Sequence, residues 1–252
     1  MVYRKNYQKL GLLLFLGFLL FGCKKDKKNQ YDNDKAVGES NLDLLTNDTY
    51  KAILVEIQYA NGYKPTDQTI SELTDFINET THKSKGVIVK TEEVSLGTGS
   101  TYSIDEIRDF EDANRVYSSS GDTVAIYFLC LNNDYEGNEG NNKVLGVAYQ
   151  NTSMALFQKS IHDLSGGFGQ PSTWLLESTV INHEFGHILG LVNNHTDMVN
   201  NHQDSANGHH CNNENCLMYW LAETGGFVDN LIGVSSVPDI DQNCKNDLSS
   251  LQ

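Results

Sequence analysis

The sequence predicts an α/β (α+β) fold, in which a twisted, mostly parallel sheet with an antiparallel edge strand packs against helices. Three observations predict it. Strand-like and helix-like patterns alternate from residue 51 onward, one strand is apolar along its whole length, and residues 193–252 carry few periodic signals. The sequence therefore predicts a sheet and helix subdomain over 51–192 and a small irregular C-terminal subdomain over 193–252.

The first elements follow the order strand, helix, strand, helix, strand. β-rich runs at residues 52–60 and 86–94 flank a segment, 66–82, whose apolar residues recur at helical spacing after a threonine cap. A second helix is expected over 103–117, where a serine and a following glutamate match a capping box. The run at 123–131 is continuously apolar, as in a strand covered on both faces.

The later elements are a loop, a hairpin and a long helix. Residues 132–143 have the composition of a loop, and two short runs, 144–150 and 154–158, are expected to form a hairpin at the sheet edge. An apolar helix is expected over 172–192, with Gly190 near its end. The chain beyond it is dominated by Asn, His, Asp and Gly and is expected to be a loop as far as residue 215.

Residues 1–22 have the pattern of a secretory signal. Positive residues precede an apolar run that is too short for a comfortable membrane span. The run ends in LFGC, which resembles a bacterial lipobox and implies lipid modification of Cys23. Residues 23–50 are mostly polar and are expected to be a flexible tether. The resemblance implies an exported protein, lipid-anchored to a bacterial outer membrane and facing the periplasm or the cell surface.

Composition and charge exclude one class of partner. The chain is 39% hydrophobic, as expected of a globular protein, and has a formal net charge of −15. A phosphate backbone requires clustered Lys and Arg, which this chain lacks. We therefore expect no nucleic-acid partner.

The segment HEFGHILGLVNNH, residues 183–195, points to metal chemistry. His183 and His187 are one helical turn apart, so both imidazoles project from one face and can bind one ion. Glu184 lies where its carboxylate can take a proton from a water that zinc has made acidic. Two histidines are not enough, because a catalytic zinc needs a third protein ligand and an open position.

Gly190 extends this pattern to H-E-x-x-H-x-x-G, which resembles the metzincin zinc peptidases. In that family the glycine lets the chain turn sharply, so that a third ligand approaches from below the helix. The resemblance also implies that an edge strand, here 144–150, binds the substrate backbone by strand addition. The family's third ligand would fall on Asn193, whose neutral amide is a poor zinc ligand.

A second pattern, His210-Cys211-x4-Cys216-x-Met218, resembles the archaemetzincin branch. There the third zinc histidine runs directly into a cysteine, and the methionine of the Met-turn follows a second cysteine. The resemblance implies that His210 is the third ligand and that Met218 is the Met-turn residue beneath the zinc. An inserted loop after Val192 would separate them from the helix.

The third position has alternatives. They are His202 and His195, then Asn193, Asp197 or no protein ligand, and, in a gluzincin-like site, Glu214 or Glu223. Gly190 and the methionine pattern favour the metzincin arrangement over the gluzincin one.

Archaemetzincins add a later Cys-x-x-Cys and hold a structural zinc with four cysteines, whereas only Cys244 follows Cys216 here. One catalytic zinc is therefore expected. A disulfide between Cys211 and Cys216 is a candidate brace for the Met-turn in an exported protein. Tyr219 is expected either to hold a developing oxyanion or to pack as an aromatic side chain.

These patterns together favour a zinc-dependent metalloendopeptidase, anchored by lipid to a bacterial membrane and acting on peptides or proteins with Glu184 as general base. The alternative class is a non-catalytic zinc- or peptide-binding lipoprotein derived from a peptidase. Glu184 discriminates between the two, because a purely structural site does not need a general base.

Overall fold

A computed structural model describes residues 32–97, 99–139 and 143–252. The expected signal segment and Cys23 lie outside the described residues. Within the part that is described, no helix is both long and apolar enough to cross a membrane.

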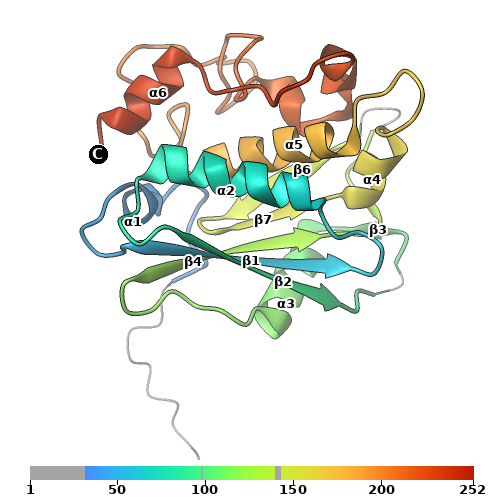
Figure 1. Ribbon diagram of the computed structural model, residues 1–252, viewed down its shortest axis with the longest axis horizontal. Helices are drawn as coiled ribbons and strands as arrows, with labels where there is room; N and C mark the ends of the chain where they lie inside the picture. The colour runs from blue at the N-terminus through green and yellow to red at the C-terminus, as the bar shows by residue number, and fades with distance from the viewer. Residues whose placement is uncertain (1–31, 98, 140–142) are drawn as a thin grey trace, which may run out of the picture.

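One five-stranded sheet forms the centre of the molecule (Figure 1). Its strands lie in the order β2-β1-β4-β7-β6. The first four pair in parallel and β6 runs antiparallel to β7 at the edge, which confirms the predicted sheet. The strands are β1 Ala52–Ala60, β2 Val87–Val94, β4 Thr123–Cys130, β6 Gly146–Gln150 and β7 Ser153–Leu156.

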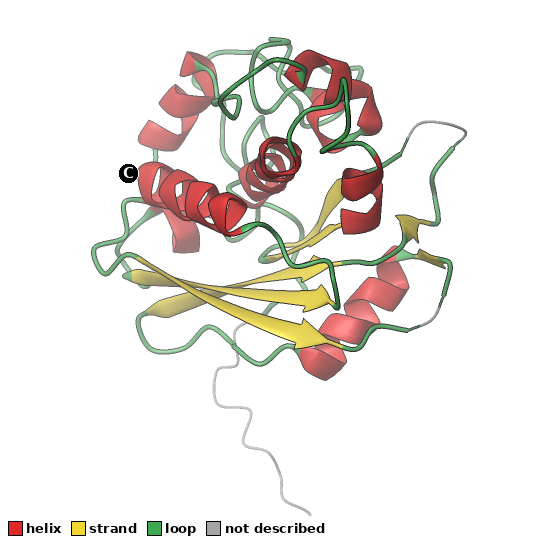
Figure 2. Ribbon diagram, turned by 45° about the vertical axis from the view of Figure 1, so that its right-hand side comes forward, coloured by secondary structure: helices red, strands yellow, loops and turns green. Residues whose placement is uncertain are grey.

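Helices cover both faces of this sheet (Figure 2). α2 (Asp67–Thr81) and α5 (Thr173–Ile188) lie on one face, with the short α4 (Gln158–Asp163) beside them, and α3 (Ile104–Asn114) lies on the other. The predicted capping box of α3 is present, with the Ser103 side chain accepting from the backbone of Glu106. Such caps satisfy N–H groups that a helix leaves unpaired at its start.

Strand β4 shows why the sheet needs both layers. Its alternate side chains enter two different hydrophobic clusters. Ile126 and Phe128 pack with the α2 and α5 side, whereas Tyr127 and Leu129 pack with Ile107 of α3. A strand that is apolar on both faces can be buried only between two layers.

A second, two-stranded sheet, β3 (Thr101–Tyr102) with β5 (Asp134–Tyr135), was not expected from the sequence. The C-terminal part is mostly loop, as expected, with two short 3₁₀ turns, η1 (Trp220–Glu223) and η2 (Gly225–Leu231). A last helix, α6 (Gln242–Ser249), lies above α2 in Figure 1.

The end of the expected tether is instead part of the folded domain. Residues Asn41–Leu45 form α1, in which Leu44 and Leu45 are buried. The Asn41 side-chain amide donates to the His195 carbonyl at 2.8 Å and to the Thr196 hydroxyl at 2.9 Å. Two apolar residues and one amide are too small a signal to stand out in a polar stretch, so this docking was missed.

Candidate metal centre

Helix α5 carries the candidate metal ligands into the core. All its residues from Leu175 to Ile188 are buried, between the sheet and the C-terminal loops. His183 and His187 lie on the face that turns away from the sheet, toward the segment that holds Leu217 and Met218. The polar groups of this helix must therefore be satisfied inside the protein.

Gly190 makes the turn that brings the chain back under the helix. It has φ +77°, and a Cβ there would lie 2.6 Å from the Asn194 carbonyl oxygen and 2.8 Å from the Thr196 hydroxyl. Only glycine accepts this backbone conformation and this close approach without strain. The sharp turn expected from the sequence is therefore present.

Three imidazoles converge beyond this turn. The Nε2 atom of His187 lies 3.1 Å from that of His183 and 3.2 Å from that of His210. Ligands that surround one zinc tetrahedrally at 2.0–2.1 Å lie about 3.3 Å apart. The spacing of the three nitrogen atoms thus suits a single ion.

The opposite nitrogen atoms fix the tautomers of two of these rings. Nδ1 of His183 lies 2.7 Å from the Leu217 carbonyl oxygen, and Nδ1 of His210 lies 2.6 Å from that of Asn207. A carbonyl oxygen only accepts, so each Nδ1 carries the proton and donates it. Each Nε2 then presents a lone pair to the shared centre, as in metal-binding histidines whose second nitrogen is held by a hydrogen bond.

Burial keeps these histidines neutral. It lowers the pKa of His183 to about 3, with a further contribution from His210, and it lowers the pKa of His187 well below its usual value. Burial also lowers the pKa of His210. Neutral imidazole is the form that binds zinc, so protons do not compete for these atoms near neutral pH.

Glu184 lies beside the centre with one oxygen unpaired. Its Oε2 accepts from the Ala148 backbone N–H of the edge strand at 2.7 Å, while Oε1 is buried without a hydrogen-bond partner among the described residues. Burial, with a contribution from Glu223, raises the pKa of Glu184 well above its usual value. Three converging lone pairs and an orphaned carboxylate oxygen are satisfied together by a cation, so these residues fit a metal ion such as zinc.

Gly146 sets the distance between strand β6 and Glu184. A Cβ at this position would lie 2.5 Å from a methyl group of Val180 and 2.8 Å from Oε1 of Glu184. The missing side chain therefore lets the edge strand approach α5 closely enough for Ala148 to bind the carboxylate.

Met218 packs directly against helix α5. A Cβ added at Gly186 would collide with the Met218 sulfur, so the thioether packs on the bare helix backbone between the two histidine positions. Its carbonyl accepts from the Cys211 N–H at 2.7 Å, next to His210. Tyr219 is half-buried with its ring centroid 6.0 Å from that of Trp220, which is an aromatic contact.

The alternative third ligands lie elsewhere. The side chains of His195, Asn193, Asp197 and Glu214 are exposed. His202 is buried but its Nε2 lies 2.7 Å from Asp247 Oδ2, away from the other three histidines. Glu223 is near the centre in addition to His210 and does not replace it, with Oε2 3.8 Å from His210 Nε2 and 4.0 Å from His183 Nε2.

A second group of ligand atoms surrounds His202. The Nδ1 atom of His202, the sulfur atoms of Cys211 and Cys244 and a carboxylate oxygen of Asp241 lie within 4.8 Å of one another. The sulfur of Cys216 lies 3.8 Å from that of Cys244. All these cysteines are free thiols, so the expected Cys211–Cys216 disulfide is not formed in this structure. This group was not predicted from the sequence, because its members come from three separate segments of the chain.

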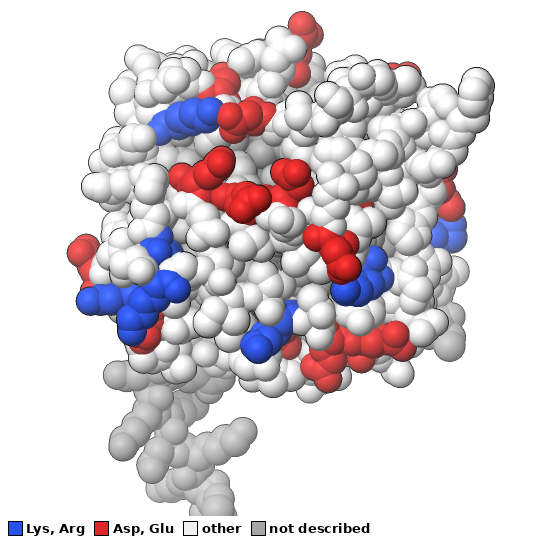
Figure 3. All heavy atoms as spheres, viewed as in Figure 1, with Lys and Arg blue, Asp and Glu red and all other residues white. Residues whose placement is uncertain are grey.

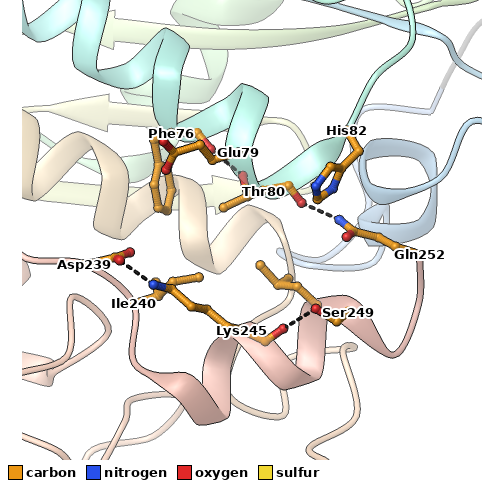
Figure 4. Close-up of a pocket in the computed structure, with 10 residues that line it drawn as sticks. Phe76, Glu79, Thr80, His82, Asp239, Ile240, Lys245, Ser249 and Gln252 are labelled. Carbon is orange, nitrogen blue, oxygen red and sulfur yellow. Dashed lines mark hydrogen bonds and ion pairs between the residues drawn. The ribbon is translucent and has the colours of Figure 1, made fainter.

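Two further features of the surface lack such chemistry. A cavity of about 410 Å³ lies between the end of α2 and α6 (Figure 4), where the Gln252 side chain donates to the Thr80 carbonyl and Lys245 pairs with Asp239. It holds none of the residues of either ligand group. On the face shown in Figure 3, basic side chains are scattered among acidic ones and form no continuous patch.

Comparison with known proteins supports the fold. Archaemetzincin from Methanopyrus kandleri superimposes with a TM-score of 0.51 and 15% sequence identity, over 82% of this chain and 98% of that one. Metalloproteinase-II from Bacteroides fragilis gives a TM-score of 0.42 and 13% identity over 90% of this chain, which spans 58% of that protein. No family model and no curated protein sequence matches the chain. The protein therefore has an archaemetzincin-like fold.

Proposed function

We propose that the protein is a zinc-dependent metalloendopeptidase of the metzincin type. The observation that carries this proposal is the convergence of three neutral imidazole nitrogens beside a buried carboxylate that lacks a partner on one oxygen. His183, His187 and His210 would hold the ion. Bound there, zinc would polarise the scissile carbonyl and lower the pKa of a water enough for attack at neutral pH.

Glu184 is the general base in this proposal. The Ala148 N–H holds its Oε2, which leaves Oε1 to take the proton of the attacking water and later to deliver it to the leaving amine. A cation nearby favours the ionised carboxylate, opposing the effects of burial and of Glu223. A bound ion would therefore favour the ionised form of Glu184, which is the form that can accept a proton.

Strand β6 is the strand that we propose binds the substrate backbone. It is the edge strand and pairs only with β7 in the described sheet. Apart from the Ala148 N–H, which binds Glu184, we propose that its other edge pairs with the backbone of an extended peptide. The Ala148 contact ties the same strand to Glu184. A peptide aligned on β6 would therefore be placed relative to the general base.

We further propose that the second ligand group binds a structural zinc through His202, Cys211 and Cys244, with the neighbouring Cys216 as fourth ligand in place of Asp241. Three thiolates and one imidazole are a common structural zinc set. Asp247 accepts from Nε2 of His202 and so directs Nδ1 toward the sulfur of Cys211 at 3.4 Å. A one-ion protein, as expected from the sequence, would leave this buried set of donors without a cation.

The test of the enzymatic proposal is the Glu184→Ala variant. Wild-type protein should bind zinc at the three histidines and cleave a peptide library, and the variant should keep its zinc content while cleavage falls by about 10²-fold or more. Glu79→Ala, at an exposed acid on α2, is the matched control and should leave cleavage unchanged. Full cleavage by Glu184→Ala would refute the proposal, and zinc binding without any cleavage by wild type would favour the non-catalytic binding lipoprotein.

Export and lipid anchoring rest on the sequence pattern at residues 1–23 alone. We propose that Cys23 carries the lipid and that this lipid anchors the folded domain to a bacterial membrane. Cys23→Ala should move the protein from the membrane fraction to the soluble fraction. An unchanged distribution would contradict the anchor without affecting the peptidase proposal.

A further inference from the structure

The carboxylate of Glu223 lies on the open side of the candidate metal centre. Its Oε2 forms one group with the Nε2 atoms of His183, His187 and His210, and all four atoms lie within 4.8 Å of one another. The distances to the His210 and His183 nitrogens are 3.8 and 4.0 Å. Three histidines and Glu223 thus supply four donors, the number that fills a tetrahedral zinc site.

The Glu223 carboxylate has few polar neighbours other than these histidines among the described residues. Within the described chain, the Glu223 side chain accepts no hydrogen bond. The imidazoles of His183 and His210 lie near its Oε2, but their protons are on the Nδ1 atoms, which donate to backbone carbonyls. A partly buried carboxylate with no donor is unfavourable unless a cation is near. A divalent ion at the three histidines would supply that cation and would also lie near Glu184, whose Oε1 has no partner among the described residues.

The backbone of Glu223 is fixed to the segment that enters the edge strand. Its carbonyl accepts from the Leu145 N–H at 2.8 Å, and Thr224 forms a β-bridge with Val144. Strand β6 begins at the next residue, and its Ala148 holds Glu184. The edge strand and the residues just before it therefore contact both acids, through the carboxylate of Glu184 and through the backbone of Glu223.

We propose that Glu223 is the fourth protein ligand of the metal when no substrate is bound, and that it gives up this place to the attacking water when a peptide docks on β6. The resting site would be closed by the protein, which is a built-in latency. The inference rests on the metal site of the proposed function, though not on peptide hydrolysis. In this exchange the metal–carboxylate bond would break and a metal–water bond would form, with no change of oxidation state.

The test compares Glu223→Gln and Glu223→Asp with wild type after Co²⁺ replaces zinc. Gln removes the charge at almost the same size, and Asp keeps the charge on a side chain too short to reach. Any cobalt at the thiol group contributes equally to all three spectra, so difference spectra isolate the histidine centre. In both variants the visible absorption of the cobalt centre should shift from that of wild type, because water would replace the carboxylate as fourth ligand, and the affinity of that centre for zinc should fall by about tenfold or more.

Exposed Glu214 supplies the control, because Glu214→Gln should leave both the spectrum and the affinity as in wild type. A weakened affinity with an unchanged cobalt spectrum would show that Glu223 acts only as a nearby charge and would overturn the inference. Unchanged values in both measurements would overturn it as well. Failure of wild type to bind any ion at the histidines would instead refute the metal site itself.

Discussion

At the scale of single residues, two glycines and two backbone carbonyls determine where the metal-binding groups can lie. The carbonyls of Leu217 and Asn207 orient the rings of His183 and His210. Gly190 provides the turn and Gly146 the close approach of the edge strand. None of these residues would touch the ion, yet each decides whether the ligand atoms converge.

Gly190→Ala should therefore disrupt the centre. An alanine there combines a left-handed backbone with a clash against Asn194, and we expect a loss of roughly 1–3 kcal/mol of stability together with weaker zinc binding. Gly62→Ala is the matched control, since Gly62 has φ +80° with nothing within 4 Å of the added carbon. Chemical denaturation and zinc titration measure both effects. Equal losses in the two variants would show that backbone strain alone, not the turn's packing, is responsible.

Some residues of the candidate metal centre could be predicted from the sequence, and others could not. His183, Glu184, His187 and Gly190 are close in sequence and on one helix, so their spacing was enough to predict that they act together. Choosing among the histidines after the helix required a pattern around Cys211 and Met218, because an inserted loop hides the distance between the ligand atoms. Glu223 was considered only as a replacement for His210, whereas the structure places it beside the three histidines.

At the scale of elements, helix α1 shows that a short segment can be missed when secondary structure is predicted from the sequence. Its five residues include three leucines, but they follow a long polar stretch and are too few to show a periodic pattern. In the structure Asn41 of this helix binds the loop that follows α5. The alternating strands and long helices were predictable because their periodicity extends over many residues. The two-residue strands β3 and β5 and the docking of α1 depend on contacts with distant residues, so local patterns could not predict them.

The role of α1 can be tested with two leucines of the same short helix. Leu44 is fully buried and Leu42 is 53% exposed. Leu44→Ala should lower the free energy of unfolding by about 2–5 kcal/mol, and Leu42→Ala should change it by less than about 0.5 kcal/mol. Urea denaturation of the two variants measures the difference. Similar small effects would mean that the segment before residue 50 is a tether after all.

In the whole molecule, the sheet and its helices hold two groups of candidate metal ligands, which lie on helix α5 and on the C-terminal segments after it. His210 and Cys211 are adjacent, so the polar segment between α5 and Met218 is attached to both groups at one point. The Cys211 and Cys216 spacing suggested a local disulfide, but the fold brings Cys244 of α6 to the same place. Which cysteines meet was not predictable, because α6 has no sequence motif that fixes its position.

The second group gives a prediction for the molecule as a whole. Cys244→Ser should lower the zinc content by about one ion per chain and lower the melting temperature, because a structural zinc contributes directly to folding. The histidine centre should keep its ion in this variant. Cys130→Ser, in the buried strand β4, is the control for loss of a thiol without loss of metal. An unchanged zinc content in Cys244→Ser would remove the second ion from the account.

The proposed metal centre can be tested by X-ray diffraction at the zinc absorption edge from crystals of the zinc-loaded protein. We expect an anomalous peak about 2.0–2.1 Å from the Nε2 atoms of His183, His187 and His210, with Glu184 beside it but not bound to it. A peak bound by His195 or His202 in place of His210, or no peak on helix α5 at all, would contradict it.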